Sequence, residues 1–367
     1  MGSQLKYRVE FTSPTICRFV GNAFGEKTLW LNIINFLPLY KDCWLNFAKL
    51  NYNLETKRSS SIPGVSVRAP GFGSTQFIEY IAPFPQTMSL TSYYVNLVDH
   101  LSKSGYRREH NLRGAPYDFR KAPHEQQEFF NSLKKLVERT YKKNGNKPII
   151  FIGHSMGGNF AYLFLRMQSL SWKKKYIRAL MTIATPWGGN FKYMYDYLYD
   201  DDYPANIFPV VRLAERTWSS MAFLLPQPHI FHDSPLISTP SFNYTSETHK
   251  EFFDKINNKI AYQMYEDVKP ILADLKHPEV DVYVIGGLGY KTLRGLIYEK
   301  DSFTSNKKIV YGNGDEFVNQ ESLKGCMHWK ENKKFKFVFK TIREDHLSIL
   351  KNNAALQLIS SIINEIK

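Results

Sequence analysis

Pro148-Ile-Ile-Phe-Ile-Gly-His-Ser-Met-Gly-Gly158 joins a short apolar run to a serine that lies between two glycines. A short apolar run bounded by turn residues is typical of a buried strand in a parallel sheet. From Gly157 to Gln168, apolar residues recur at helical spacing. A Gly-x-Ser-x-Gly pattern between a strand and a helix predicts a nucleophile elbow, a tight turn that presents a serine hydroxyl above the sheet. A glycine-rich turn with an incidental serine is the alternative.

We predict Ser155 as a nucleophile on this basis. The flanking glycines allow the backbone to make the turn without Cβ clashes. The helix that follows directs its first N–H groups and the positive end of its dipole toward a developing oxyanion. The N–H of Met156 is therefore the predicted oxyanion donor.

Helices and strands alternate on both sides of this turn. Apolar residues between Phe129 and Tyr141 recur at three- and four-residue steps, which predicts a helix. Buried strands are predicted at Ile177 to Ala184 and at Val280 to Ile285. Residues 334–340 alternate Lys with Phe and predict a strand with one solvated face, and Ala354 to Ile366 predicts a last helix. This order indicates an α/β fold with a mostly parallel sheet.

The residues after Ser155 include candidates for a base and an acid. In sheets that carry such an elbow, an acid and then a histidine follow the serine. His346 follows the last predicted strand, at the end of the sheet where the serine lies, and we predict it as the base; His328 is the alternative. Asp315 follows a Gly-Asn-Gly turn and is the predicted acid. Asp345 adjoins His346, but neighbouring side chains on an extended segment point apart.

The composition is that of a folded chain with a strongly basic surface. Of 367 residues, 43% are hydrophobic and 15% aromatic, a content that excludes a disordered chain. The net charge is +14. No run of about 18 apolar residues indicates a membrane span. The charge alone is consistent with a solvated surface, anionic lipid or nucleic acid. No nucleic-acid-binding module accompanies it, so we expect no nucleic-acid partner.

The chain resembles the lecithin:cholesterol acyltransferase and lysosomal phospholipase A family over nearly its whole length. The motifs that carry the resemblance are Val67 to Gly73, Gly114 to Arg120, the Ser155 elbow, Pro186 to Gly189 and Ser238 to Thr245. The resemblance implies an α/β-hydrolase fold with Ser155 as nucleophile, Asp315 as acid and His346 as base. It also implies transfer of a fatty acyl group from a glycerophospholipid to water, a sterol or another alcohol, without metal or cofactor.

The family's organisation implies four segments. Residues 13–50 would form a membrane-binding segment, 51–189 the first part of the hydrolase core, 190–270 a cap with a lid at about 211–234, and 271–367 the second part of the core. The stretch from 190 to 265 is rich in Tyr, Pro and Phe and shows no clean strand pattern, which is consistent with a cap. We expect a monomer.

Three cysteines allow one disulfide and a free thiol, or three free thiols. The resemblance implies a disulfide between Cys17 and Cys43, which bracket the membrane-binding segment, and a free Cys326 because Val284 stands at its family partner's position. A persistent disulfide implies an oxidising compartment. The family resemblance places the protein outside the cell or in an endolysosomal or vacuolar lumen, although the chain as written has no signal peptide.

The resemblance also assigns contacts with the substrate and the membrane. In the bracketed segment Trp30 and Leu31 would contact lipid, as amphipathic and apolar side chains do at an interface. Phe223 and Leu224 of the lid would cover the acyl chain, and Lys192 would meet the phosphate. Asn243 begins the single Asn-x-Thr glycosylation sequon.

One departure from the family concerns the start of the chain. The family's first hydrolase strand, and the turn that supplies a second oxyanion donor, precede the match to Met1, so we expect both to be missing and the true start to lie upstream. Loss of such a donor costs on the order of 10²–10³ in rate. Two other hypotheses are kept: a general carboxylesterase with the same triad and no lipid preference, and, because of the missing donor, an inactive lipid-binding homologue.

Overall fold

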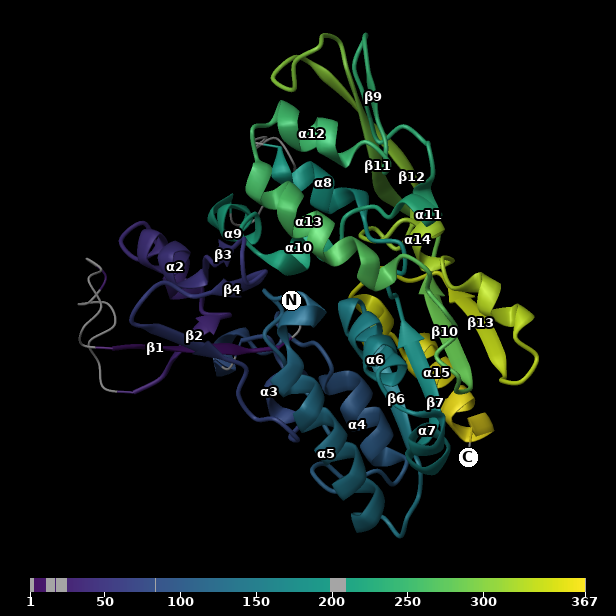
Figure 1. The fold of residues 1–367 in the computed structure, drawn as a ribbon. Coiled ribbons are helices and arrows are strands. Elements are labelled where there is room, and N and C mark those ends of the chain that lie inside the picture. Colours follow the sequence, from purple (N-terminus) through teal and green to yellow (C-terminus); the bar gives the residue numbers. More distant parts are fainter. Residues whose placement is uncertain (1–2, 11–16, 18–24, 83, 199–208, 367) are drawn as a thin grey trace. The chain divides into compact units, whose positions relative to one another are not determined.

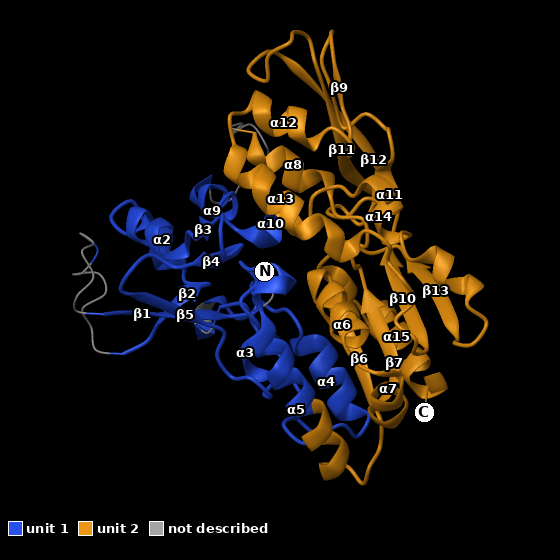
Figure 2. Ribbon diagram, viewed as in Figure 1, with its two compact units in different colours: residues 1–136, 201–221 blue, residues 137–200, 222–367 orange. Residues whose placement is uncertain are grey.

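The computed structural model describes residues 3–10, 17, 25–82, 84–198 and 209–366 (Figure 1). The chain divides into two compact units (Figure 2), of which unit 1 comprises Met1–Leu136 and Asp201–Met221, and unit 2 comprises Val137–Asp200 and Ala222–Lys367. The division expected from the resemblance, with boundaries at residues 51, 190 and 271, follows the order of the chain and stays a prediction.

Unit 2 is built on a parallel sheet in the order β13-β10-β7-β6. Its strands are β6 (Ile149–His154), β7 (Ile177–Ile183), β10 (Val282–Gly287) and β13 (Phe337–Ile342). The central strands β7 and β10 are buried along almost their whole length, as parallel strands covered on both faces must be. The four strands predicted from the sequence are present, which confirms the α/β fold.

Helices follow the predicted pattern in this part of the chain. They are α5 (Gln127–Lys143), α6 (Met156–Arg166), α7 (Leu170–Tyr176) and α15 (Asn353–Ile366). The buried residues of α15 recur at three- and four-residue steps, so the helix presents one apolar stripe to the core. α6 begins directly after β6 and packs against β6 and β7, which fixes the turn that contains Ser155.

A second sheet of unit 2, in the order β12-β11-β8-β9, was not predicted. Its strands are β8 (Ile237–Ser238), β9 (Asn243–Tyr244), β11 (Tyr290–Tyr298) and β12 (Lys307–Gly314). The remaining helices of this unit are α8 (Phe191–Tyr197), α11 (Pro228–Phe231), α12 (His249–Lys255), α13 (Lys259–Leu272) and α14 (Gln320–Leu323), with 3₁₀ turns at Met327–Glu331 and Ser348–Leu350.

Unit 1 contains an antiparallel sheet in the order β2-β1-β5. The strands of the unit are β1 (Leu5–Val9), β2 (Lys27–Trp30), β3 (Asn51–Asn53), β4 (Arg58–Ser60) and β5 (Val65–Arg68). Its helices are α2 (Lys41–Ala48), α3 (Gln76–Glu79), α4 (Val95–Lys103), α9 (Pro209–Glu215) and most of α10 (Ser219–Phe223), with 3₁₀ turns at Ile33–Phe36, Pro85–Thr87 and Pro123–Glu125.

The cysteines adopt the arrangement that the resemblance implies. Cys17 and Cys43 form a disulfide with their Cα atoms 5.4 Å apart, and Cys326 is a free thiol in the interior of unit 2. Burial raises the pKa of the Cys326 thiol far above its usual range, so this thiol is unreactive. None of the helices that the structure describes is long and apolar enough to cross a membrane.

A buried ion pair stabilises unit 1. The guanidinium of Arg120, 1% exposed, donates to the Asp118 carboxylate at 2.9 and 2.7 Å. It also donates to the carbonyls of Phe47 and Ala48 at the end of α2, at 3.3 and 3.4 Å, which have no helical partner of their own. Burial alone would raise the pKa of Asp118, but the charge and hydrogen bonds of Arg120 hold it below the ordinary value.

We expect Arg120→Met to destabilise unit 1 by about 3–5 kcal/mol, because the substitution leaves the Asp118 carboxylate buried without its counter-ion. Urea denaturation followed by circular dichroism measures the loss. The matched control is Arg68→Met in the same unit, which removes the exposed pair with Glu26 and should cost much less. Equal losses in the two variants would contradict this account of Arg120.

Candidate active site

The serine lies at a strained turn between β6 and α6. Ser155 has φ 54° and ψ −136°, a conformation that residues with a side chain rarely adopt. Its N–H donates to the carbonyl of Ile183 on β7 at 2.9 Å, and its carbonyl accepts from Gly158 N–H at 2.9 Å. α6 starts at Met156, so the N–H groups of its first turn point toward the serine side of the turn.

The glycines of the motif have different roles. A Cβ on Gly153 would lie 2.7 Å from the Cα and the N of Gly158, because the end of β6 touches the first turn of α6. A Cβ on Gly158 would collide with the side chain of Thr185. A Cβ on Gly157 would meet no atom within 4 Å. The close approach of β6 and α6 therefore requires Gly153, and the contact between α6 and Thr185 requires Gly158, whereas Gly157 is not required by packing.

The structure brings together the three residues predicted from the sequence. His346 Nε2 lies 3.0 Å from Ser155 Oγ, and His346 Nδ1 lies 2.8 Å from Asp315 Oδ2. Asp315 is fully buried, and its other carboxylate oxygen accepts from the N–H groups of Phe317 and Val318 at 3.1 and 2.6 Å. The carboxylate accepts the Nδ1 proton, which leaves Nε2 free to accept the serine proton.

The acid reaches this site through an insertion in the fold. The chain leaves the main sheet at Gly287, forms the β11–β12 hairpin, and returns at Asp315. A Cβ on Gly287 would lie 2.8 Å from the Cβ of Asp315, so the side chain of Asp315 lies directly against Gly287. Asp315 thus lies at the end of β10, next to the strand that leads to His346.

The alternative base and acid have other partners. The ring of His328 is paired through Nε2 with the carbonyl of Leu275 at 3.0 Å. Asp345 accepts the N–H groups of Leu347 and Ser348 at 2.9 Å each, as a turn-capping carboxylate does. Neither residue has a contact with Ser155 in the described part of unit 2.

Two aromatic rings that the sequence did not point to flank the imidazole of His346. The ring of His154 lies 4.8 Å away and that of Phe317 lies 4.9 Å away, centroid to centroid. In the sequence, His154 is marked only by its place in the elbow motif, and Phe317 only by its position two residues after Asp315. The fold brings both rings to His346, one from the end of β6 and one from the loop after Asp315.

Lys192 contacts the ring of Phe317, which itself contacts the imidazole of His346. Its Nζ is 5.8 Å from the centroid of Phe317 and forms an ion pair with the buried carboxylate of Asp196. Asn190 fixes the start of α8 by accepting the N–H of Lys192 at 2.9 Å and by donating to the carbonyl of Phe317. Lys192, the predicted phosphate contact, is therefore linked to Phe317 both by its ammonium and through Asn190.

The two lid residues, Phe223 and Leu224, are 1% and 4% exposed. The carbonyl of Leu224 accepts the N–H of Asn190 at 2.8 Å, and the N–H of Gln227 donates to Gly188 at 2.8 Å. In unit 2, the segment after residue 222 is thus hydrogen-bonded to the Pro-Trp-Gly-Gly loop.

In unit 1, Trp30 is not at the surface. It is 8% exposed and packs edge-on against Phe36 and Phe119, and Leu31 is tied by its N–H to the carbonyl of Ile81 at 3.0 Å. The end of β2 is buried, since Leu29 and Trp30 are 1% and 8% exposed. The exposed apolar side chains of this segment are Ile33, Ile34, Leu37 and Leu39, at 44, 56, 51 and 78%. Residues 13–16 and 18–24 of the predicted segment lie outside the described part of the chain.

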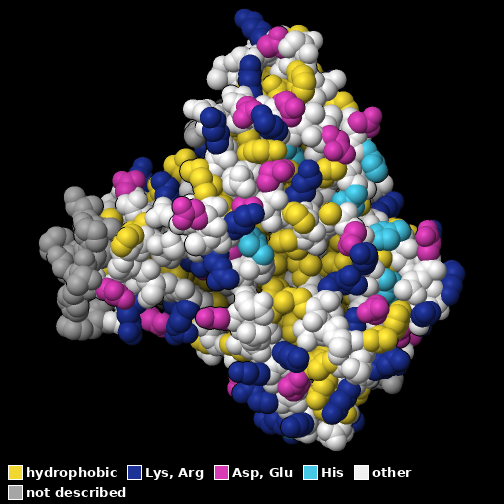
Figure 3. Space-filling model, in the orientation of Figure 1, with side chains coloured by type: hydrophobic (Ala, Val, Ile, Leu, Met, Phe, Trp, Pro, Cys, Tyr) yellow, Lys and Arg dark blue, Asp and Glu magenta, His cyan; other side chains and the backbone are white. Residues whose placement is uncertain are grey.

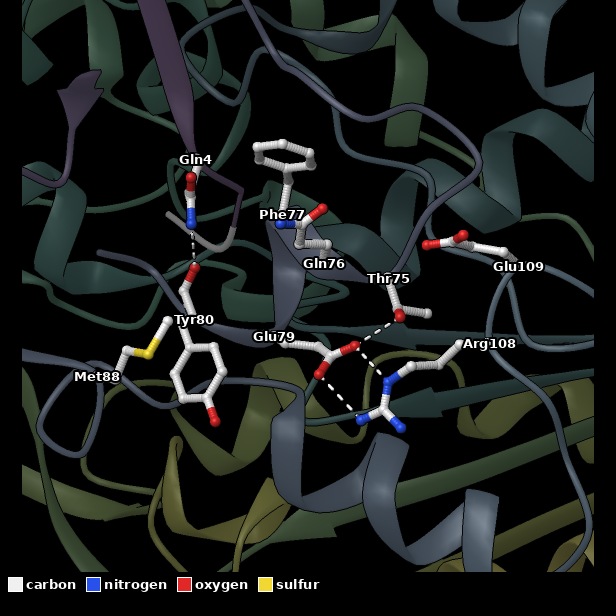
Figure 4. A pocket seen from close by; sticks show the side chains of 9 residues that line it. All are labelled: Gln4, Thr75, Gln76, Phe77, Glu79, Tyr80, Met88, Arg108 and Glu109. Carbon is white, nitrogen blue, oxygen red and sulfur yellow. Dashed lines mark hydrogen bonds and ion pairs between the residues drawn. The ribbon is translucent and has the colours of Figure 1, made fainter. Parts of the chain in front are cut away.

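A pocket of ≈ 370 Å³ lies in unit 1 (Figure 4). Its buried carboxylate, Glu79, is paired with the guanidinium of Arg108 at 2.9 and 3.0 Å and accepts the hydroxyl of Thr75. Since this charge is already neutralised and no triad residue lines the pocket, we assign the pocket no part in the reaction.

A family model for lecithin:cholesterol acyltransferase matches residues 24–271 and 257–355. The chain belongs to the lecithin:cholesterol acyltransferase family. It is 34% identical to the phosphatidylcholine-sterol acyltransferase of Gallus gallus over 372 residues, which cover 98% of this chain and 87% of that protein. It is 32% identical to the lysosomal phospholipase A and acyltransferase of Homo sapiens over 374 residues, or 99% of this chain and 88% of that one.

Among solved structures, a chain of the Tle4–Tli4 complex superposes with a TM-score of 0.50 at 13% identity, covering 68% of this chain and 67% of that chain. This likeness concerns the fold alone. Together with the family and the β6–Ser155–α6 elbow, it makes unit 2 an α/β-hydrolase fold, as the sequence indicated.

The packing at the elbow gives a stability prediction. We expect Gly153→Ala to destabilise the protein by about 1–3 kcal/mol, because the added methyl group collides with backbone that cannot move without shifting α6. The control is Gly157→Ala, two residues beyond the serine, which has room for its methyl group and should keep the wild-type melting temperature. Scanning calorimetry of both variants measures the difference, and an equal loss in Gly157→Ala would refute the role assigned to strand–helix contact.

Proposed function

We propose that the protein transfers a fatty acyl group from a glycerophospholipid to water or an alcohol through an acyl-enzyme on Ser155. The observation that carries the proposal is the continuous hydrogen-bonded chain from Asp315 through His346 to Ser155, at 2.8 and 3.0 Å. Membership of the lecithin:cholesterol acyltransferase family, and relatives named for sterol acyl transfer and for phospholipase A activity, support the choice of substrate.

The reaction follows from the geometry. His346 Nε2 takes the proton from Ser155 Oγ as that oxygen attacks the ester carbonyl of the lipid. The oxyanion of the tetrahedral intermediate accepts the N–H of Met156 at the start of α6, while Asp315 stabilises the imidazolium. His346 then gives its proton to the departing alcohol of the lysophospholipid. Water or an acceptor alcohol, deprotonated by the same imidazole, attacks the acyl-serine and releases the product.

Lys192 is our candidate for the lipid phosphate. Its ammonium lies over the ring of Phe317, which in turn covers His346. A phosphate there would compete with Asp196, the present partner of Lys192. Phe223 and Leu224, which are apolar and bonded to the same loop through the backbone of Asn190, are our candidates for contact with the acyl chain.

We propose that unit 1 contacts the lipid surface through Ile33, Ile34, Leu37 and Leu39, here named the apolar ridge. These side chains are exposed between β2 and α2, and the disulfide ties α2 at Cys43 to Cys17. Exposed apolar side chains insert at an interface because they leave water. The charge of +14 would favour anionic lipid, and Lys and Arg are spread over the face shown in Figure 3 instead of gathering in one groove.

The compartment follows from the same features. The disulfide is expected to persist in an oxidising environment, outside the cell or in an endolysosomal or vacuolar lumen. Asn243 is exposed on β9, where an oligosaccharide could be attached without displacing the core. We also propose that the protein is a monomer and that the acyl acceptor is water, a sterol or another alcohol.

Ser155→Ala should abolish release of fatty acid from phosphatidylcholine vesicles, with a loss of 10³-fold or more, because no other group can form the acyl-enzyme. Product analysis of vesicles with and without sterol measures the loss and identifies the acceptor. The control is Ser361→Ala, an exposed serine on α15, which should keep full activity. Retained activity in Ser155→Ala would overturn the assignment, and wild-type turnover of short soluble esters alone would indicate a carboxylesterase.

Ile34→Ser should weaken vesicle binding roughly tenfold, because about 1.4 kcal/mol of apolar transfer energy is lost. Ile260→Ser is the control, since Ile34 and Ile260 are 56 and 54% exposed and Ile260 lies on α13 of unit 2. Vesicle sedimentation measures binding, and turnover of a soluble ester should stay unchanged in both variants. Equal binding by the two variants would show that the apolar ridge does not reach the lipid.

A further inference from the structure

The residue before the nucleophile is a histidine that contacts the catalytic histidine in two ways. His154 Nε2 lies 2.7 Å from the backbone carbonyl oxygen of His346, and the two rings are 4.8 Å apart. His154 is 2% exposed and belongs to β6. All of these atoms are in unit 2. None of these contacts is needed to relay a proton from Ser155 to Asp315.

The contact fixes the protonation of this ring. A carbonyl oxygen only accepts hydrogen bonds, so the Nε2 of His154 must carry the proton that is shared with His346. Burial and the neighbouring His346 lower the pKa of His154 well below its usual range, so the ring is neutral. A neutral ring is what the site requires, because a second positive charge beside His346 would oppose formation of its imidazolium.

We propose that His154 is a positioning residue that holds His346 at the distance from Ser155 at which the proton can be transferred. The inference rests on the proposed function in that His346 acts as the base. It adds a residue that acts through His346 and does not touch the substrate.

The other ties of His346 explain why this one matters. His346 follows β13 in a loop, and two of its hydrogen bonds, from its N–H and from Nδ1, both go to Asp315, at 2.8 Å each. These bonds orient the ring toward the acid but do not attach it to the strand that carries the nucleophile. His154 makes that attachment. Two consecutive residues therefore hold His346, one at its carbonyl and one at Nε2.

The strained turn makes this double contact possible. Neighbouring side chains on an extended strand point to opposite faces. Ser155, with φ 54° and ψ −136°, departs from the extended conformation directly after His154, and the serine Oγ and the His154 ring then both reach the same residue. The elbow thereby brings the nucleophile and the residue that positions its base to one place.

Two substitutions of similar chemistry separate positioning from packing. In His154→Gln, the amide nitrogen takes about the place of Nε2 and can still donate to the His346 carbonyl. In His154→Asn, the amide is one methylene shorter and cannot reach it. The control is Tyr162→Phe on α6, a buried residue that loses an equivalent hydrogen bond, from its hydroxyl to the carbonyl of Lys276 at 2.9 Å.

The readouts are kcat and KM for a soluble short-chain ester, and the rate at which a fluorophosphonate labels Ser155. Both depend on the serine and His346 and not on a lipid surface. We expect kcat and the labelling rate to fall 10- to 100-fold in His154→Asn with KM within twofold of wild type, since a shift of about 1 Å in a catalytic group can cost 10²-fold. We expect His154→Gln to stay within fivefold of wild type, and Tyr162→Phe to lose stability but not kcat.

A His154→Asn variant as fast as Tyr162→Phe at equal folded fraction, or a His154→Gln variant as slow as His154→Asn, would overturn the positioning role. If His154→Asn does not fold, His154→Phe replaces it, because phenylalanine keeps the ring and lacks the donor. Failure of the wild-type serine to react with the fluorophosphonate would refute the proposed function itself. Normal labelling without turnover of phospholipid would refute only the lipid substrate.

Discussion

The contact between the end of β6 and the first turn of α6 is the constraint on which the site depends. It leaves no room for a Cβ at Gly153 and forces Ser155 into a conformation that side chains rarely adopt. Strain of this kind persists only where the surrounding structure holds it, and here the N–H of Ser155 is bonded to β7 and its carbonyl to Gly158. The serine hydroxyl, the oxyanion donor and the contact from His154 to His346 all originate at this one turn.

The elbow and the last strand were predictable because their signals are local. An apolar run, two glycines and a helical period lie within 21 residues. The alternation of Lys and Phe before His346 is also local, since it lies within residues 334–340. The β11–β12 hairpin was missed because its pattern is broken. The register shifts between Leu293 and Gly295, and the burial of β11 does not alternate, so the sequence lacks the period of two that marks a strand.

The sequence also could not show which side chains of the apolar segment are buried and which are exposed. Trp30 and Ile34 both belong to an apolar segment between two cysteines, and an amphipathic tryptophan is the usual choice for a lipid interface. In the structure, Trp30 belongs to β2 and lies on the core, whereas Ile34 belongs to the 3₁₀ turn that follows and is 56% exposed. Composition cannot separate them, because the difference depends on which residues pair with β1.

Ser155 and His346, 191 positions apart, meet because parallel strands deliver both to one edge of the main sheet. Ser155 follows β6, and His346 follows β13 after a short loop. Asp315 follows β12, a strand of a different sheet, yet its side chain lies against Gly287 at the end of β10. The hairpin between Gly287 and Asp315 is therefore an excursion that begins and ends at the same point of the core, so its length and sequence can vary without moving the acid. The loop that carries His346 also approaches Gly287, through the carbonyl of Glu344, and the hydrogen bond from His154 to the His346 carbonyl attaches this loop to β6.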